Sequence, residues 1–274
     1  MALFTIDQEK CRRDGLCAAE CPGMLIELIG PEGFPTPVAD AEERCINCGH
    51  CVAICPQGAL SLKTMTPEDC LPVRKELSLT QEDCEHFLRS RRSMRKYKEK
   101  TVPRDILTGL IKVARYAPTA SDSQPVHWLV FEDPVKVRHL AGLVVDWMRV
   151  LLEEGSEYAL TKRLDRIVNA WDQGIDRILR GAPHLVVAHG SSTLPASQSS
   201  CILALAYLEL AAPSFGLGTC WAGYFVAAAN AYPPLQEALA LPPDHLPFGA
   251  VMIGYPQYAY QRMPSRNRPP IAWR

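Results

Sequence analysis

A motif of four cysteines constrains this chain more than any other feature of its sequence. The stretch Cys45–Pro56 reads CINCGHCVAICP, so its cysteines are spaced two, two and three residues apart and a proline follows the last one. The stretch Cys11–Pro22, CRRDGLCAAECP, repeats this frame with one exchange, because Asp14 stands where the second cysteine is expected. Three thiolates in one tight loop can hold three corners of a metal centre, while the cysteine before the proline points toward a neighbouring centre. The repeat therefore predicts two metal centres that exchange ligands.

The number and the setting of the cysteines indicate which kind of centre this is. Eleven cysteines are present, an odd number, and seven of them fall within residues 11–55. The opening sequence MALFTIDQEKC lacks the basic and apolar segments of a signal peptide, so we expect a cytoplasmic protein. In a reducing cytosol, clustered cysteines bind metal more often than they form disulfides. Zinc sites usually pair two C-x2-C units across a longer loop. Iron–sulfur clusters are therefore favoured over zinc and over disulfides.

Residues 3–65 resemble the bacterial two-cluster ferredoxins, whose cysteine run has the same spacing and the same final proline. The resemblance implies two iron–sulfur clusters with crossed ligation. The second cluster would be held by Cys45, Cys48, Cys51 and Cys21. The first would be held by Cys11, Cys17, Cys55 and, if it binds iron, Asp14. Carboxylate is a harder ligand than thiolate, so the iron at Asp14 is expected to be labile and the cluster to be 4Fe–4S or, after its loss, 3Fe–4S. The alternative is that Asp14 is a solvated loop residue.

The rest of the sequence predicts a second, larger domain. Residues 1–65 are rich in Cys, Pro and Gly and have too few large apolar residues for an independent core, so we expect this domain to need its metal. Residues 66–84 resemble a polar linker, and residues 85–274 have an alternating pattern of helices and strands. The expected strands are Leu3–Ile6, Met24–Ile29, Ala59–Lys63, Val126–Phe131, His184–His189 and Ala250–Gly254. The expected helices include 104–116 and an almost entirely apolar one near 201–212.

Composition excludes several classes of function. The chain of 274 residues is 47% hydrophobic and 22% charged, which suits two globular domains. Its net charge of −1 gives no electrostatic reason to expect nucleic acid or a membrane surface as a partner. The longest apolar stretch, Cys201–Phe215, is interrupted by Glu209 and Pro213 and is too short to span a bilayer. We interpret it as a helix in the core or at an interface.

Electrons that enter a cluster domain need an acceptor, and three stretches after residue 85 suggest a flavin. The first, RSRRSMRKY at 89–97, concentrates guanidinium groups that suit phosphate binding, although alone it would equally fit a solvated basic face. The second, APTASDSQP at 117–125, is a polar loop after a predicted helix. The third, GLGTCWAG at 216–223, is not a G-x-G-x-x-G, because Trp221 occupies the last glycine position, so a Rossmann site is not supported. Its glycines can still bring backbone N–H groups close to a ligand.

Taken in this order, the three stretches resemble the nitroreductase family of FMN enzymes, over about residues 85–274. The resemblance implies an α+β protein, in which a small ferredoxin-like two-cluster domain precedes a nitroreductase-like mixed β-sheet flanked by helices. It also implies a homodimer with FMN at the interface. By position, the phosphate would contact Arg91, Ser93 and Arg266, assisted by Arg262 or Arg268, and the flavin pyrimidine would lie near Arg92 and Arg95. The loop residues Pro118, Thr119, Ala120, Asp122 and Gln124 would face the flavin, the first three from the partner chain. A backbone N–H from Trp221, Ala222 or Gly223 would face flavin N5.

One residue departs from the family pattern, which usually has asparagine where this chain has Asp122. An acidic group beside a flavin would lower its potential, unless it faces the N3–H donor or is protonated. We expect no catalytic side chain, because flavin N5 would carry the chemistry. Cys70, Cys84, Cys201 and Cys220 fit no ligand frame, and His127, His184 and His189 flank strands as structural residues would.

The predicted function is one-to-two electron conversion. Single electrons from a low-potential donor, a ferredoxin or similar protein, would pass through the clusters to FMN. FMN would then reduce a small organic acceptor such as a nitro compound, a quinone or an activated double bond. Three alternatives remain open: flow in the reverse direction, with the clusters exporting electrons; a relay or redox sensor without a substrate; and direct reduction of the flavin by NAD(P)H beside structural clusters.

Overall fold

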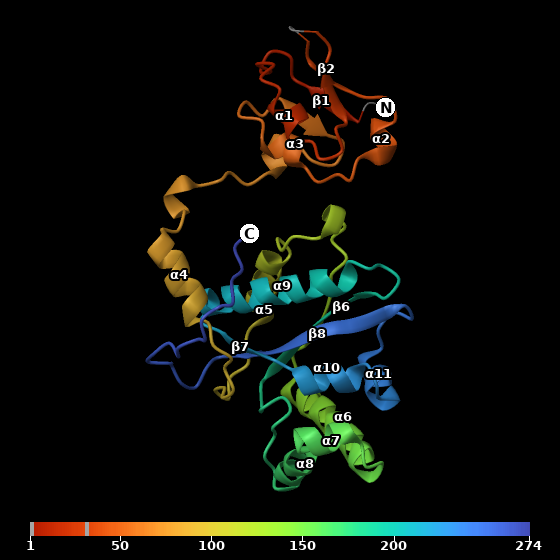
Figure 1. The fold of residues 1–274 in the computed structure, drawn as a ribbon, viewed down its shortest axis with the longest axis vertical. Coiled ribbons are helices and arrows are strands. Elements are labelled where there is room, and N and C mark those ends of the chain that lie inside the picture. The colour runs from red at the N-terminus through yellow and green to blue at the C-terminus, as the bar shows by residue number, and fades with distance from the viewer. Residues whose placement is uncertain (1–2, 31–32) are drawn as a thin grey trace. The chain divides into compact units, whose positions relative to one another are not determined.

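The computed structural model describes residues 3–30 and 33–274, which form two compact units. The first runs to Ser78 and also includes Ser121–Ser123, and the second comprises Leu79–Ala120 and Gln124–Arg274. The first unit is small and is built around two short antiparallel ribbons (Figure 1). In the first ribbon β1 pairs with β4, and in the second β2 pairs with β3. The strands and short helices are β1 (Phe4–Ile6), α1 (Leu16–Ala19), β2 (Ile26–Leu28), β3 (Pro35–Pro37), α2 (Ala41–Arg44), α3 (His50–Ala53) and β4 (Leu60–Leu62). Its core is a single small cluster of side chains.

The segment after the first unit is more ordered than the predicted linker. Two 3-10 turns, η1 (Pro67–Asp69) and η2 (Lys75–Leu77), are followed by α4 (Gln81–Ser90). Thr80 caps α4, since its hydroxyl accepts a hydrogen bond from the Asp83 N–H at 3.1 Å and the Asp83 carboxylate bonds back to Thr80. This reciprocal capping satisfies donors that a helix start would otherwise leave unpaired. The helix therefore begins inside the range 66–84 that the sequence predicts to be a linker.

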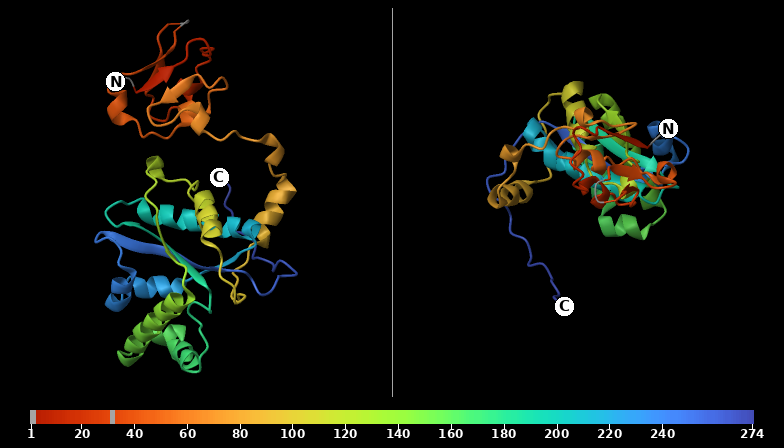
Figure 2. Two further views of the ribbon diagram at one scale, coloured as in Figure 1. Left: turned by 180° about the vertical axis from the view of Figure 1, so that it is seen from behind. Right: turned by 90° about the horizontal axis from the view of Figure 1, so that it is seen from above.

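The second unit is a four-stranded sheet covered by helices on both faces (Figures 1 and 2). The strand order is β5–β6–β8–β7, and every neighbouring pair is antiparallel. The α+β class is thus confirmed, but within the described residues this sheet is antiparallel throughout instead of mixed. The elements that follow α4 along the chain are α5 (Arg104–Ala114), η3 (Ala120–Asp122), β5 (His127–Phe131), α6 (Pro134–Glu153), α7 (Glu157–Lys162), α8 (Leu164–Asp172), β6 (His184–Ser191), α9 (Ser197–Ala211), η4 (Ala212–Phe215), β7 (Gly218–Trp221), α10 (Gly223–Ala229), α11 (Pro233–Leu239) and β8 (His245–Gly254).

Alternation along the buried strands separates the two cores. In β6, Leu185 and Val187 pack into the core formed with α6, α8, α10 and α11. Their neighbours Val186 and Ala188 pack into the opposite core, formed with α5 and α9. Successive side chains of a strand point to opposite faces, so a continuous apolar run is what a strand buried on both faces requires. The sheet is consequently the rigid centre of this unit.

Two strands, β3 and β7, were not predicted from the sequence. β3 begins and ends with proline, and β7 lies inside the stretch predicted to be a glycine-rich turn. Prolines are tolerated in β3 because it pairs on one side only, with β2. β7 is also an edge strand, paired with β8 alone. Within the described residues, no helix combines the length and the apolar character needed to cross a membrane.

Candidate functional site

The two cysteine motifs have the same backbone conformation. Gly15 and Gly49 both lie in the left-handed region, with φ of 74° and 73°. Arg13 and Asn47, two residues earlier in each motif, both have φ of 56°. Glycine adopts positive φ without a steric penalty, whereas other residues do so only where the surrounding structure holds them. The sequence repeat is therefore a repeat of loop geometry.

Asp14 and Cys48 occupy equivalent places in these loops. Each lies between a left-handed residue and a left-handed glycine, and each glycine begins a short helix, α1 or α3. One oxygen of Asp14, Oδ1, accepts a hydrogen bond from the Leu16 N–H at 3.2 Å. The second oxygen, Oδ2, has no hydrogen bond among those the structure records. The exchange of cysteine for aspartate is thus accommodated by the same loop conformation.

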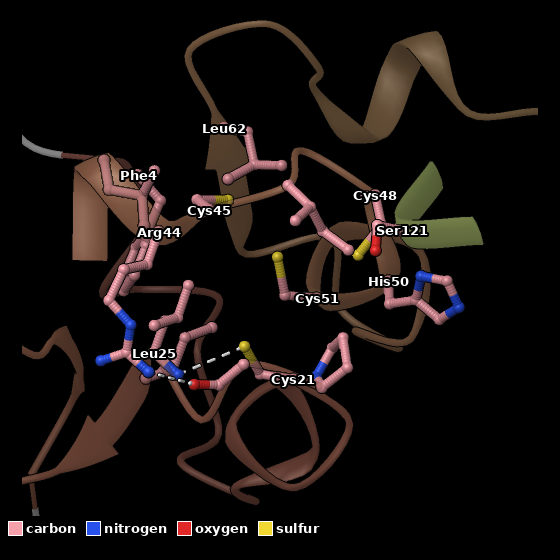
Figure 3. Close-up of a pocket in the computed structure, with 16 residues that line it drawn as sticks. Phe4, Cys21, Leu25, Arg44, Cys45, Cys48, His50, Cys51, Leu62 and Ser121 are labelled. Carbon is pink, nitrogen blue, oxygen red and sulfur yellow. Dashed lines mark hydrogen bonds between the residues drawn. The ribbon is translucent and has the colours of Figure 1, made fainter. Parts of the chain in front are cut away.

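The cysteine that precedes the proline joins the other motif's cysteines around a cavity. A cavity of about 270 Å³ is lined by Cys21, Cys45, Cys48 and Cys51 (Figure 3). Burial first, and then the neighbouring thiols of Cys21, Cys45 and Cys48, raises the pKa of the Cys51 thiol to about 11. The Cys21 sulfur accepts a hydrogen bond from the Leu25 N–H at 3.3 Å. Three cysteines of one motif and one of the other therefore surround a common volume.

The reciprocal set surrounds a second, smaller cavity, which is lined by Cys11, Asp14, Cys17 and Cys55. Burial raises the pKa of the Cys17 thiol, and the nearby thiols of Cys55 and Cys11 add to the shift. The Cys55 sulfur accepts a hydrogen bond from the Ala59 N–H at 3.4 Å, which matches the bond to Cys21. N–H groups directed at sulfur favour the thiolate that metal binding requires.

The two donor sets surround cavities of unequal size, about 270 Å³ at Cys21, Cys45, Cys48 and Cys51 and about 10 Å³ at Cys11, Asp14, Cys17 and Cys55. Among the described residues, no three Cys, His or carboxylate side chains converge closely enough to hold one metal ion. Four thiols around the larger cavity fit a multi-atom cluster held by cysteine. Cys70 packs against the core of this unit and lines neither cavity.

In the second unit, the arginine run lies beside β7. α4 ends at Ser90, and the chain then runs past β7, where the Met94 N–H donates to the Thr219 carbonyl at 2.8 Å. A Cβ placed on Gly218 would lie 2.8 Å from Cβ of Met94, so only glycine permits this approach. A cavity of about 330 Å³ opens here, and its lining includes Arg91, Arg92 and Thr219. Two of the three predicted flavin stretches are thus adjacent.

The individual arginines of the run differ in their contacts. Arg91 forms an ion pair with Glu209 of α9, Nη1 to Oε1 at 3.0 Å. Nη1 of Arg92 donates to the backbone carbonyls of Arg89 and Arg91, while its buried Nε has no hydrogen-bond partner within the described residues. Arg95 lines a neighbouring cavity of about 280 Å³. The backbone carbonyl of Ser93 accepts a bond from the Tyr260 hydroxyl at 3.5 Å. An orphaned guanidinium N–H beside a cavity is compatible with an anionic ligand.

The turn after β7 shows which backbone N–H groups of residues 221–223 are already engaged and which have space for a ligand. The Ala222 N–H already donates to the Ala250 carbonyl at 2.9 Å, which continues the pairing of β7 with β8. Gly223 begins α10, and a Cβ placed on it would meet no atom within 4 Å. Of the three residues predicted to face flavin N5, Ala222 therefore has its donor engaged, and Gly223 has open space beside it.

The loop 118–124 has an unusual backbone. Ser121, Asp122 and Gln124 are non-glycine residues with φ of 52°, 49° and 44°. Such conformations cost on the order of 1 kcal/mol or more each and are concentrated at functional sites. The Gln124 N–H donates to Thr119 Oγ1 at 3.1 Å, which closes the loop on itself. Pro118 and Ala120 are exposed, so they are available to a ligand or a second chain.

The C-terminal arginines are not gathered with the rest of the predicted site. After β8 the chain has no helix or strand, and Arg262, Arg266 and Arg268 are exposed (Figure 2). The residues of this segment that line the 330 Å³ cavity are Pro256 and Tyr258–Tyr260. In this chain alone, the tail arginines are therefore separate from Arg91 and Ser93.

Sequence reasoning missed one buried carboxylate at this site. Glu209 is 7% exposed on α9, and both of its oxygens are bonded: Oε1 to Arg91 and Oε2 to the Trp221 indole N–H at 3.0 Å. The signal was an acidic residue inside the apolar run Cys201–Phe215. A charge that interrupts such a run is rarely buried unless it is paired.

Three histidines meet at another edge of the sheet. His127, His189 and His245 come from β5, β6 and β8, and Nδ1 of His189 lies 2.9 Å from Nδ1 of His245. Burial, followed by the two neighbouring imidazoles, lowers the pKa of His189 to about 4. His184 accepts a hydrogen bond at Nε2 from the Val102 N–H at 2.7 Å. These contacts give the histidines structural roles.

Comparison with known proteins identifies both units. The model of the nitroreductase family matches residues 88–255. The chain belongs to the nitroreductase family. A 4Fe–4S dicluster domain model matches residues 9–60, so an iron–sulfur domain precedes the nitroreductase domain. This chain is accordingly an oxidoreductase.

The similar proteins cover the nitroreductase domain. A Methanothermobacter thermautotrophicus protein with the provisional name NADH dehydrogenase/NAD(P)H nitroreductase is 24% identical over 173 residues, which is 62% of this chain and 75% of that protein. An iodotyrosine deiodinase of Thermotoga neapolitana is 29% identical over 131 residues, 48% of this chain and 68% of that protein. The crystal structure of a Bacteroides fragilis nitroreductase with bound FMN has a TM-score of 0.56 at 22% identity, covering 69% of this chain and 96% of that one. The fold is shared.

Proposed function

We propose that this chain is an FMN-dependent oxidoreductase in which two iron–sulfur clusters relay single electrons to FMN, which then reduces a small organic acceptor. The observation that carries this proposal is the pair of cavities lined by exchanged cysteines, in a chain whose other domain belongs to the nitroreductase family. A domain of one-electron carriers joined to a flavin enzyme has a direct use as a one-to-two electron converter. The covalent link keeps the donor at a high effective concentration and removes a docking step.

The proposed cluster ligands are the two sets that line the cavities. One cluster is held by Cys21, Cys45, Cys48 and Cys51, and the other by Cys11, Cys17, Cys55 and Asp14. The equivalence of the loop positions of Asp14 and Cys48 supports the aspartate as a ligand. Its oxygen is a harder donor than sulfur, so this corner loses its iron most readily and the cluster becomes 3Fe–4S under oxidation.

The proposed flavin site lies along the arginine run and the end of β7. Arg91, Arg92, Ser93 and Arg95 supply cationic and polar groups for the phosphate and the pyrimidine edge, and Gly223 offers the backbone N–H. Pro118, Thr119 and Ala120 complete the site from a second copy of the chain. Asp122 and Gln124 face the flavin, and Arg266 contacts the phosphate with the help of Arg262 or Arg268. FMN bound there would accept electrons singly and deliver them as a hydride from N5. The chain's own part is to bind, orient and shield it.

A homodimer is supported by exposed apolar side chains on α9. Ile202, Leu203 and Tyr207 are each about 40% exposed, although the opposite side of the helix, with Cys201, Leu205 and Leu208, is buried in the core. A row of half-exposed apolar residues on a central helix is typical of a surface that another chain covers. Dimerisation would also explain how the exposed loop 118–120 and the exposed tail reach a flavin.

The direction of electron flow distinguishes this proposal from its alternatives. In the forward direction, a low-potential donor such as a ferredoxin reduces the clusters, and the flavin reduces a nitro compound, a quinone or an activated double bond. In the reverse direction, the flavin oxidises a substrate and the clusters export electrons. A relay or redox sensor would show reversible reduction of both cofactors without turnover.

An anaerobic potentiometric titration, followed by EPR and visible absorption, tests the proposal. We expect two iron–sulfur signals with potentials at or below that of FMN, and turnover with a nitroarene or a quinone when a chemically reduced ferredoxin is the donor. A flavin potential far below both clusters would favour the reverse flow. The double variant Cys45→Ser with Cys48→Ser is the control. If it retained full NADPH-driven turnover, electron entry through the clusters would be refuted.

A further inference from the structure

One buried carboxylate connects the two ends of the proposed flavin site. Oε1 of Glu209 is 3.0 Å from Nη1 of Arg91, and Oε2 accepts the indole N–H of Trp221 at 3.0 Å. Arg91 follows α4 at the phosphate end, and Trp221 ends β7 at the end that would face N5. Glu209 itself lies in the last turn of the core helix α9. Three separate elements are therefore joined through one side chain.

The surroundings of Glu209 favour a fixed geometry. Its side chain is 9% exposed, so few waters can replace its partners, and a buried carboxylate must keep its partners or lose stability. The Trp221 ring lies close to Gly249 of β8, because a Cβ there would lie 3.3 Å from Cζ3 of the indole. Leu205, one helical turn before Glu209, would meet that Cβ as well. The indole is thus confined between α9 and β8.

Arg91 keeps capacity for a ligand while it is held. Its side chain remains 28% exposed, and it lines the 330 Å³ cavity together with Glu209. A guanidinium has five N–H donors in a planar fork, of which the ion pair with Glu209 engages Nη1. An arginine that is fixed before the ligand arrives loses less side-chain entropy on binding a phosphate than a free one does. The ion pair is therefore compatible with phosphate binding and would aid it.

We propose that Glu209 is a positioning residue for the flavin: it fixes the guanidinium that receives the phosphate and the indole that precedes the N5-facing turn, so that the two ends of the site are set together. This inference rests on the proposed FMN function. The Glu209 side chain does not touch the reacting atoms. Loss of the Glu209 carboxylate would free both Arg91 and Trp221. Loss of the indole N–H alone would free only Trp221, which precedes the turn proposed to face flavin N5.

The test compares FMN binding and flavin geometry in three variants of the full-length protein. Glu209→Gln keeps the shape of the side chain but removes its negative charge. The amide can accept the Trp221 hydrogen bond, but it cannot form the ion pair with Arg91. Trp221→Phe removes the indole N–H and keeps an aromatic ring. Glu132→Gln is the matched control, since Glu132 pairs with Arg104 on the exposed surface of the same domain. The FMN dissociation constant is measured by the quenching of flavin fluorescence, and the bound geometry by visible circular dichroism.

Glu209→Gln should raise the FMN dissociation constant at least tenfold and change the dichroism band of the bound flavin. Trp221→Phe should change that band with a smaller loss of affinity, and Glu132→Gln should change neither. The double variant Glu209→Gln with Trp221→Phe should lose less FMN affinity than the sum of the losses in the two single variants, because both residues act through one network. If Glu209→Gln lowered the melting temperature but left both flavin readouts as in the wild type, Glu209 would be a structural ion pair and this inference would be wrong. A wild-type protein that bound no FMN would instead refute the proposed function.

Discussion

The iron–sulfur domain and the nitroreductase domain differ most in how much apolar surface each buries. Among the described residues, six buried side chains form the core cluster of the first domain, whereas the two cores of the second contain 26 and 13. A domain of about 65 residues with so small a core does not usually fold unaided, while a sheet covered on both faces does. The comparison teaches that the first domain depends on its ligands for its fold and that the second depends on its packing.

Removal of iron is the strongest way to break this comparison. Chelation under oxidising conditions should unfold the first domain, because its seven motif cysteines then lose the centres that join them. Hydrogen exchange followed by mass spectrometry should show loss of protection in β1 and β4 and unchanged protection in β6 and β8. Protection of β1 and β4 that survives complete iron loss would contradict the metal dependence of this domain.

Truncation of the core should affect only the second domain. Phe225 of α10 is fully buried, so Phe225→Ala should cost about 3 to 5 kcal/mol in the free energy of unfolding. All five tryptophans follow residue 120, so urea unfolding monitored by tryptophan fluorescence reports on this domain alone. The exposed Val135 provides the control, and Val135→Ala should change the free energy by less than about 0.5 kcal/mol. If the loss in the free energy of unfolding depended on the iron content of the first domain, the second domain would not be stabilised by its own packing alone.

The histidine cluster makes the stability of the second domain depend on pH. The pKa of His189 falls from 6.5 to about 4 on folding, so the unfolded chain binds the proton more readily between these values. The stability that neutral His189 contributes is fully present above pH 6.5 and is lost as the pH falls toward 4. The loss in the free energy of unfolding is at most about 3 kcal/mol. Urea midpoints between pH 7.5 and 4.5 measure this, and His189→Gln should flatten the slope. An unchanged slope would show that His189 does not cause the dependence and would favour His184, whose pKa burial also lowers.

A reciprocal exchange inside the first domain tests the smallest difference, that between its two motifs. Asp14→Cys should stabilise the labile corner and retain about one more iron per chain after oxidation. Cys48→Asp should transfer the lability to the other cluster. EPR after ferricyanide treatment reports the 3Fe–4S signal in each case. If both variants kept the wild-type iron content and signal, the side chain at this position would not be a ligand.

Much of this architecture follows from the sequence alone. The spacing of the cysteines and the two Cys-Pro endings indicate clusters, because ligand spacing is a local property. The strands at 126–131, 184–189 and 250–254 and the helices near 104–116 and 201–212 were predicted within a few residues. Apolar periodicity reflects burial on one or both faces, which a sequence displays directly. The order of the three flavin stretches led to the correct family.

The tertiary structure decided the features that depend on contacts between distant residues. The edge strand β7 was not predicted, because its glycines suggested a turn. In the structure, Gly218 is needed because Met94 packs closely against it. The pairing of Arg91 with Glu209 joins residues 118 positions apart, so no local pattern reveals it. The sequence by itself determined the ligand frames, the two domains and the family. Only the folded chain decided which charge holds Arg91 and that residues 218–221 form an edge strand, since both depend on distances that arise when separate elements pack.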